Sequence, residues 1–210
     1  MSGRVEAVCL VHADRPNHRG AQTAIDKRQV EHPVRIKTLG PMGDHVGDRR
    51  HHGGVDQAVY AYAEEEASRW AEELGRPVPA GYFGENLRLS GVAVTDAVVG
   101  SHWSIGSALL EVTAPRIPCA TFQHWTGEAQ WVKRFTARGD VGTYLRVLTE
   151  GTVGSGDDVD VVHVPAHGVT VRELFALHDL DRVAPLLDHP NLAAGERSRI
   201  QKALRRTAAR

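Results

Sequence analysis

Cysteine is scarce in this chain of 210 residues, which holds only Cys9 and Cys119. Two thiols cannot supply the cysteine set of an iron–sulfur cluster, and the sequence has no flavin motif. A disulfide between them is not expected in a reducing compartment. The sequence therefore reveals no electron-transfer centre in this chain.

Strong net charge and long apolar runs are also lacking. The formal net charge is −1 at pH 7, which does not call for a nucleic acid polymer or an anionic membrane as a partner. No apolar run is long enough to span a bilayer, and the start of the chain reads as a strand rather than a signal peptide. We expect a cytoplasmic protein with neither membrane nor nucleic acid polymer as partner. The oligomeric state stays open, a homodimer being one option.

Glycine-rich nucleotide-binding motifs are absent, since no Gly-x-Gly-x-x-Gly follows a strand and there is no P-loop. Short alternating segments with glycine turns between them instead predict strands at 5–12, 34–39, 58–62, 87–89, 108–113, 143–149 and 159–164. Helices are predicted as inserts, around 64–74 and 131–138. This pattern favours a mainly β fold with inserted helices, a β-barrel rather than a doubly wound sheet.

The character of the chain changes near Pro165. A capping box at Thr170 to Glu173 predicts a helix through Leu177, and two more helices are expected at 181–187 and 195–206. We therefore predict a barrel domain over residues 1–164 and a small three-helix C-terminal domain over residues 165–210. The last helix is rich in arginine and lysine, which is typical of a solvated face and also allows a docking surface.

The stretch Pro115-Arg116-Ile117-Pro118-Cys119 carries the first chemical signal. Two prolines stiffen the chain after a predicted strand, so that Cys119 is presented from an ordered segment. A guanidinium three residues away favours the thiolate, the form of cysteine that binds metals or attacks electrophiles. A buried cysteine without chemistry is the alternative.

A polar, glycine-rich loop over residues 43–57 carries the second signal. Loops that gather histidine, aspartate and arginine on a rigid scaffold are frequent sites of chemistry. Gly53 and Gly54 allow backbone N–H groups to approach a ligand closely. His51 and His52 point to opposite sides of an extended chain, so at most one of them is expected to face a given site. A zinc or iron hydrolase site, with Asp44 and Asp48 as further ligands, is an alternative.

Several stretches together resemble the MOSC family, the domain named after the C-terminal part of molybdenum cofactor sulfurases, and in particular its YiiM-like bacterial branch. The resemblance covers nearly the whole chain, including the helical C-terminal part. It rests on Thr23-Ala24-Ile25 with Lys27, Gly43-Asp44, His52-Gly53-Gly54, Phe83-Gly84-Glu85-Asn86-Leu87, Pro115-Arg116-Ile117-Pro118-Cys119, Tyr144-Leu145-Arg146-Val147 and Gly156-Asp157.

This resemblance implies a β-barrel that binds molybdenum cofactor (Mo-molybdopterin), with Cys119 as the metal ligand. A soft thiolate suits such a metal. His52 is expected to donate protons, and Glu85 to act in catalysis by orienting substrate or pterin together with Asn86, although a turn cap is the plainer interpretation of both. The cofactor's anionic phosphate and pterin would be held by Lys27, Arg49, Arg116 and the backbone of Gly53 and Gly54.

The family resemblance further implies a reductase of N-hydroxylated compounds such as hydroxylamino-purines, supplied with electrons by a separate reductase protein. The sulfurases carry a pyridoxal-phosphate domain that this sequence does not show, so sulfur abstraction from cysteine is not expected. A carrier that holds the cofactor or a sulfur atom on Cys119 and passes it on is the alternative from another class.

Overall fold

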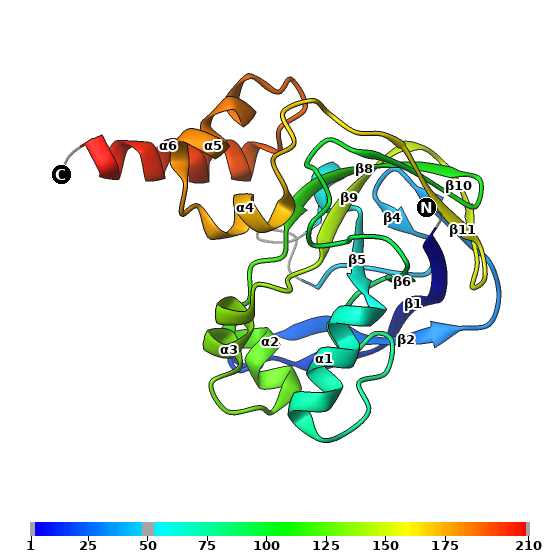
Figure 1. Ribbon diagram of the computed structural model, residues 1–210. Coiled ribbons are helices and arrows are strands. Elements are labelled where there is room, and N and C mark those ends of the chain that lie inside the picture. Colours follow the sequence, from blue (N-terminus) through cyan, green and yellow to red (C-terminus); the bar gives the residue numbers. More distant parts are fainter. Residues whose placement is uncertain (1–2, 48–52, 209–210) are drawn as a thin grey trace.

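The computed structural model of this protein describes residues 3–47 and 53–208, and the predictions for Asp48, Arg49, His51 and His52 lie outside this part. Its centre is a closed seven-stranded barrel, as predicted, in the order β11-β7-β8-β9-β5-β6-β1. Pairing of β11 with β1 closes the barrel (Figure 1). The barrel strands are β1 (Gly3–Pro16), β5 (Val59–Ala63), β6 (Leu87–Ser90), β7 (His102–Ile105), β8 (Ala108–Pro115), β9 (Thr143–Thr149) and β11 (Asp158–His163).

Further strands extend this barrel. β2 (Gln22–Val30) pairs with β1 from Val8 to Pro16, and register shifts interrupt this pairing between Val11 and Arg15 of β1. Residues 23–28 therefore form a strand, where the sequence suggested a loop or a strand end. A second, small sheet is built from β10 (Gly151–Val153), β3 (Val34–Lys37) and β4 (Gly40–Pro41).

Helices cover one side of the barrel. The inserted helices are α1 (Glu64–Leu74), α2 (Ala120–Thr126) and α3 (Trp131–Arg138), and a short 3-10 turn, η1 (Val55–Gln57), precedes β5. Trp70 of α1 packs on Trp131 of α3 with ring centroids 4.4 Å apart. Every residue of β5 is buried, because these helices lie outside it and the barrel core lies inside (Figure 1).

The C-terminal part is helical, as predicted, with α4 (Val171–Ala176), α5 (Leu180–Val183), the 3-10 turn η2 (Ala184–Asp188) and α6 (Ala194–Ala208). The capping box is confirmed: Thr170 and Glu173 exchange side chain to backbone hydrogen bonds. Leu174 and Leu186 belong to the same hydrophobic cluster as the barrel core. The helices therefore pack directly on the barrel, and the domain boundary at 164/165 stays a prediction.

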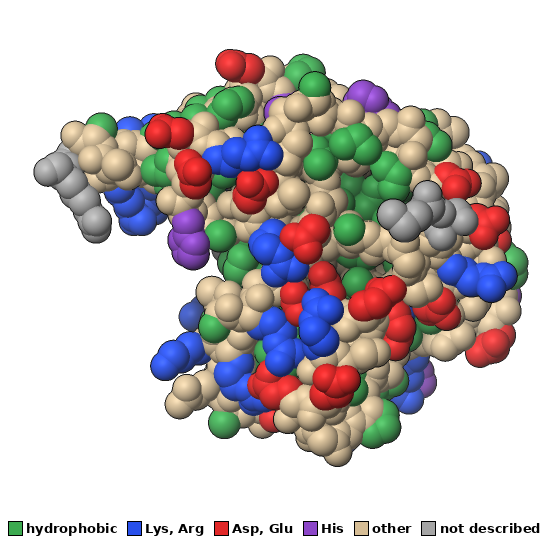
Figure 2. Space-filling view, in the orientation of Figure 1, with side chains coloured by type: hydrophobic (Ala, Val, Ile, Leu, Met, Phe, Trp, Pro, Cys, Tyr) green, Lys and Arg blue, Asp and Glu red, His purple; other side chains and the backbone are tan. Residues whose placement is uncertain are grey.

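Charged side chains of both signs gather between this helical part and the α1–α3 layer (Figure 2). Arg172 of α4 binds Asp96 and Asp140 there, and Arg69 of α1 binds the same Asp140. These pairs link the C-terminal helices to the barrel and to α1. Over the described residues, no helix has both the length and the apolar character needed to cross a membrane.

Candidate functional site

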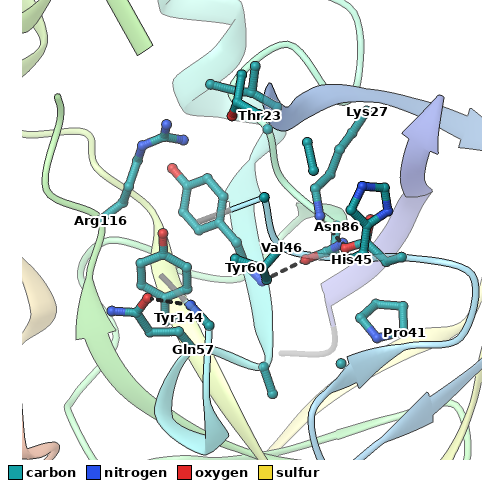
Figure 3. A pocket seen from close by; sticks show the side chains of 18 of the residues that line it. Thr23, Lys27, Pro41, His45, Val46, Gln57, Tyr60, Asn86, Arg116 and Tyr144 are labelled. Carbon is teal, nitrogen blue, oxygen red and sulfur yellow. Dashed lines mark hydrogen bonds and ion pairs between the residues drawn. The ribbon is translucent and has the colours of Figure 1, made fainter. Parts of the chain in front are cut away.

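A cavity opens between β2, the segment that follows β4, the start of β5 and the ends of β8 and β9 (Figure 3). Arg116, Tyr60 and Tyr144 lie along one side of it, and Lys27, Asn86 and His45 along the other (Figure 3). Its described lining is Asn17, Gln22, Thr23, Ala24, Ile25, Lys27, Leu39, Gly40, Pro41, Asp44, His45, Val46, Gly47, Gly53, Gln57, Ala58, Tyr60, Gly84, Asn86, Arg116, Cys119, Thr121 and Tyr144.

Cys119 lines this cavity and is partly exposed. It is the residue just before α2, with an extended backbone, so the chain leaving β8 through Pro115 and Pro118 carries it to the cavity wall. Cys9, by contrast, lies in β1 with 0% of its surface exposed. Burial raises the pKa of the Cys9 thiol to about 12. Cys119 is thus the thiol available for chemistry, and Cys9 is part of the core.

The Arg116 guanidinium lies beside Cys119 in the wall. Its carbon atom Cζ is 3.8 Å from the centre of the Phe122 ring and 5.2 Å from that of Tyr60. It also donates to the backbone oxygen of Phe83. Burial lowers the pKa of Arg116, but the neighbouring Tyr60, Tyr144 and Cys119 raise it further, so the group stays charged. A fixed cation therefore faces the space next to the thiol.

Two tyrosines complete this side of the cavity. The rings of Tyr60 and Tyr144 have centroids 5.1 Å apart. The Tyr60 hydroxyl donates to the backbone oxygen of Val141 at 2.8 Å, which fixes its orientation. Burial raises the pKa of both phenols. Both therefore stay protonated at neutral pH. Because the Tyr60 proton is donated to Val141, Tyr144 is the phenol that can donate a hydrogen bond to a ligand.

A largely buried polar network forms the opposite side of the cavity. Lys27 forms an ion pair with Asp44, whose other oxygen accepts from the backbone N–H of Val11 at 3.0 Å. Asn86 Nδ2 donates to Asp44 Oδ2 at 2.8 Å, and Asn86 Oδ1 accepts from the backbone N–H of Tyr60 at 3.1 Å. Burial lowers the pKa of Lys27, while Asp44 opposes this shift. The charge of Lys27 is therefore balanced inside the protein.

The glycines of the polar loop stand at the cavity edge. Gly53 lines it, and its N–H donates to Gln57 Oε1 at 3.2 Å. Gly54 precedes η1 with a φ of 84°, a conformation that glycine adopts without strain. Gly54 does not line the cavity, but it is exposed and adjacent to Gly53.

Glu85 does not face the cavity, and this corrects the expectation that it contacts substrate. Its side chain is 0% exposed, and Arg88, its ion-pair partner, is 1% exposed. The carboxylate accepts from the N–H groups of Gly81 at 2.8 Å and Phe83 at 2.9 Å. The neighbours Gly84 and Asn86 line the cavity instead. Glu85 thus holds the turn, the role that the residue pattern alone favoured.

Several predicted residues are thereby brought together: Cys119, Arg116, Lys27, Asn86 and Gly53 share one cavity. His52 and Arg49 fall outside the described residues. Within the described ranges, no three His, Cys, Asp or Glu side chains gather as a metal site. The hydrolase site of the alternative interpretation therefore finds no support there, although Asp48, His51 and His52 are not included.

The sequence interpretation missed Tyr60 and Gln57 and gave Tyr144 no role beyond the resemblance. Tyr60 lies in an apolar strand whose residues are all buried, so no alternation marked it. Gln57 stands three residues after Gly54, and its position in the polar loop was the available signal. His45 also lines the cavity, and its Nε2 lies 2.7 Å from Oδ1 of Asp14.

Comparisons with known proteins agree with this architecture. YflK of Bacillus subtilis is 32% identical over 151 residues, 72% of this chain and 68% of YflK. YiiM of Escherichia coli is 30% identical over 161 residues, 75% of this chain and 71% of YiiM. A protein of Gibberella moniliformis named reductase is 30% identical over 148 residues, 68% of this chain and 26% of that protein.

Solved structures show the same fold. The crystal structure of YiiM from Geobacillus stearothermophilus has a TM-score of 0.80 and 27% identity, covering 96% of this chain and 99% of that one. The model of the MOSC domain matches residues 48–160, more than half of the chain. The chain belongs to the MOSC domain family.

Proposed function

We propose that this protein is a molybdenum-cofactor-dependent reductase of N-hydroxylated compounds, with Cys119 as the metal ligand. One observation carries the proposal: the accessible thiol, Cys119, lines the same cavity as the fixed cation Arg116 and two neutral phenols. The MOSC family is associated with molybdenum cofactor, and one relative, from Gibberella moniliformis, is named reductase. The separate electron donor and the cytoplasmic location belong to the same proposal.

The donor set suits an anionic, sulfur-ligated cofactor. A cysteine sulfur is the soft ligand that a molybdenum centre accepts. Arg116 would bind the phosphate or another anionic group, because a guanidinium presents a planar fork of donors. By the resemblance Gly53, Gly54 and Asn86 would also contact the cofactor or the substrate. Gly54 is the glycine that would offer a backbone N–H, because the N–H of Gly53 is donated to Gln57 and the amide group of Asn86 to Asp44. The resemblance to the MOSC family implies that Arg49 would be a further cation that binds the cofactor.

Lys27 has a different part in this proposal from the one that the resemblance suggests. Its charge is paired with Asp44 in a largely buried position, so it is not a free clamp for a phosphate. The pair together with Asn86 would instead fix the wall against which the ligand lies. A residue held this way loses little conformational entropy when a ligand binds.

The overall reaction takes up two electrons and two protons: R–NHOH becomes R–NH2, and the oxygen leaves as water. The cofactor, when bound, supplies the two-electron redox chemistry. The chain itself has to deliver protons to the departing oxygen. His52 is the family's candidate for this step. Tyr144 is a second candidate, because its phenol stays protonated and lines the cavity.

Electrons would reach the cavity from a separate reductase protein. The exposed basic residues at the end of α6 are Lys202, Arg205 and Arg206, whereas Arg197 and Arg199 bind backbone oxygens within the helical part. This narrows the proposed docking surface to the last turns of α6. Charge reversal at Arg205 and Arg206 should then slow turnover with the protein donor but not with a small chemical reductant.

The decisive experiment measures molybdenum. Wild type, Cys119→Ala and Cys9→Ala are expressed with cofactor biosynthesis intact, and metal per protein is determined by elemental analysis. We expect molybdenum in wild type and in the Cys9 variant, and a large loss in Cys119→Ala, because the metal loses its protein ligand. Unchanged molybdenum in Cys119→Ala would refute the ligand assignment, and zinc without molybdenum in wild type would favour a hydrolase.

A carrier of cofactor or sulfur remains the second candidate, because the partial exposure of Cys119 also suits a thiol that hands its cargo to another protein. Turnover separates the two functions. The cofactor-loaded protein is mixed with a hydroxylamino-purine and a chemical reductant, and formation of the amino-purine is followed. A reductase turns over many times, whereas a carrier forms no product.

A further inference from the structure

A second hollow adjoins the cavity of Cys119, and we call it the annex. The two hollows share four lining residues, Asn17, Thr23, Ile25 and Thr121. The space therefore continues from the thiol past Thr23 and Thr121 toward the outer end of the β1–β2 hairpin. The annex is completed by Arg15, Pro16, His124 and Trp125.

Aromatic side chains from α2 form one wall of the annex. Trp125 is partly exposed, and its indole Nε1 donates to the backbone oxygen of Tyr82 at 2.9 Å. That hydrogen bond fixes the indole, because the ring cannot rotate without losing it. His124, the preceding residue, is exposed. A fixed, partly exposed indole beside a cavity is a surface on which a planar ring can stack.

Arg15 brings a positive charge to the lining of the annex. Arg15 is 46% exposed and contacts Asp26 Oδ2 through NH2 at 2.7 Å and through Nε at 2.8 Å. Asp26 is buried and is also bound by Arg28. Burial raises the pKa of Asp26, but hydrogen bonds from both arginines lower it further, so the carboxylate stays ionised. One buried carboxylate thus balances only one of the two arginines.

We propose that the annex binds the phosphate-bearing end of a planar ligand, with the ring against Trp125 and the anion on Arg15. Arg15 keeps N–H donors free of Asp26, and guanidinium donors suit phosphate oxygens. The choice of a heterocyclic ring rests on the proposed function. The phosphate belongs either to a nucleotide form of the substrate or to the cofactor, and both sources present the same chemistry to the annex.

Binding of simple probes tests this proposal without turnover. Adenosine 5′-monophosphate and adenosine are titrated into the purified, cofactor-free protein by calorimetry. We expect the monophosphate to bind about tenfold more tightly than adenosine, and Arg15→Ala to abolish that difference. Trp125→Ala should weaken both ligands about tenfold, whereas Trp125→Phe, which keeps a ring, should stay within about threefold of wild type.

Arg19→Ala is the matched control, because Arg19 is an exposed arginine of the same hairpin that does not line the annex. It should bind both ligands as wild type does. Thermal unfolding verifies that each variant is folded. Equal affinity of wild type for the two ligands, or a monophosphate affinity that Arg15→Ala and Trp125→Ala leave unchanged, would overturn the proposal.

The source of the phosphate follows from molybdenum content. Arg15→Ala is expressed with cofactor biosynthesis intact and analysed for metal. Molybdenum at the wild-type level assigns the annex to the substrate, and a loss assigns it to the cofactor. Cys119 is intact in all these variants and the titrations use cofactor-free protein. A failure of the annex and a failure of the proposed function are therefore seen in separate measurements.

Discussion

The buried ion pair of Glu85 and Arg88 stabilises the turn next to the cavity, and a single substitution tests this role. The Glu85 carboxylate accepts four hydrogen bonds: from Gly81 N–H at 2.8 Å, from Phe83 N–H at 2.9 Å, and from Arg88 at 2.9 Å through Nε and at 2.5 Å through NH2. Three of these reach Oε1, and one reaches Oε2. The replacement Glu85→Gln keeps the shape of the side chain and removes its charge.

The loss of stability in Glu85→Gln follows from these contacts. A glutamine oxygen in the Oε1 position keeps three hydrogen bonds, but its NH2 group then faces the N–H of Phe83, and two donors meet. Leaving a buried N–H without an acceptor costs about 1–3 kcal/mol. Arg88 also loses its buried counter-charge and keeps only Glu64, which is 45% exposed. Breaking a buried pair in this way costs about 3–5 kcal/mol in total.

Urea unfolding at neutral pH measures the effect. We expect Glu85→Gln to lower the free energy of unfolding by about 3–5 kcal/mol. Glu64→Gln is the matched control, because it removes the exposed partner of the same arginine and should cost at most about 1 kcal/mol. If the two variants lost equal stability, or if Glu85→Gln lost less than about 1 kcal/mol, the structural role of Glu85 would be refuted.

The remaining predictions concern thiol reactivity and pH. Iodoacetamide should modify native protein at Cys119 and spare Cys9, which is 0% exposed with its pKa raised to about 12; peptide mass spectrometry locates the adduct, and modification of Cys9 first would contradict the structure. Burial raises the pKa of Glu66 to about 7 from 4.5. The folded state then binds the extra proton, so stability should fall as the pH rises between these values and level off above. Glu66→Gln, which keeps an acceptor for Thr95, should remove this slope in unfolding curves; an unchanged slope would contradict the assignment.

The general architecture could be predicted because local patterns and global fold agree. Alternation marked β1, and the Thr170 capping box marked the start of α4. β2 was harder to predict, because its polar residues Asp26, which is buried, and Lys27, which is partly buried, are paired with Arg15 and Asp44 from other segments. Such partners are close in space and separated in the chain, so local periodicity does not reveal them.

The candidate site could be predicted in part. The prolines before Cys119 and the resemblance to the MOSC family pointed to the thiol and to Arg116, and both line the cavity. Glu85 was misassigned because its sequence neighbours line the cavity while its own side chain points into the turn. Tyr60 was missed because a strand that is buried on both faces has no polar alternation to mark a functional side chain.

The closure of the barrel has a consequence for how this protein can change over time. The β1–β11 pairing registers just Gly3 with Val159 and Arg4 with Asp158. Over the described residues, β11 and its neighbour β7 give no side chain to the cavity, which draws on β2, β4, β5 and β9. The β1–β11 pair that closes the barrel and the cavity-lining strands β5 and β9 therefore lie on opposite arcs of the barrel, while β2 lies outside the barrel and pairs with β1. Substitutions in β11 can therefore change the strand that closes the barrel without changing a residue that lines the cavity. Substitutions at the cavity-lining residues of β5 and β9 can change ligand selectivity without altering the β1–β11 pairing.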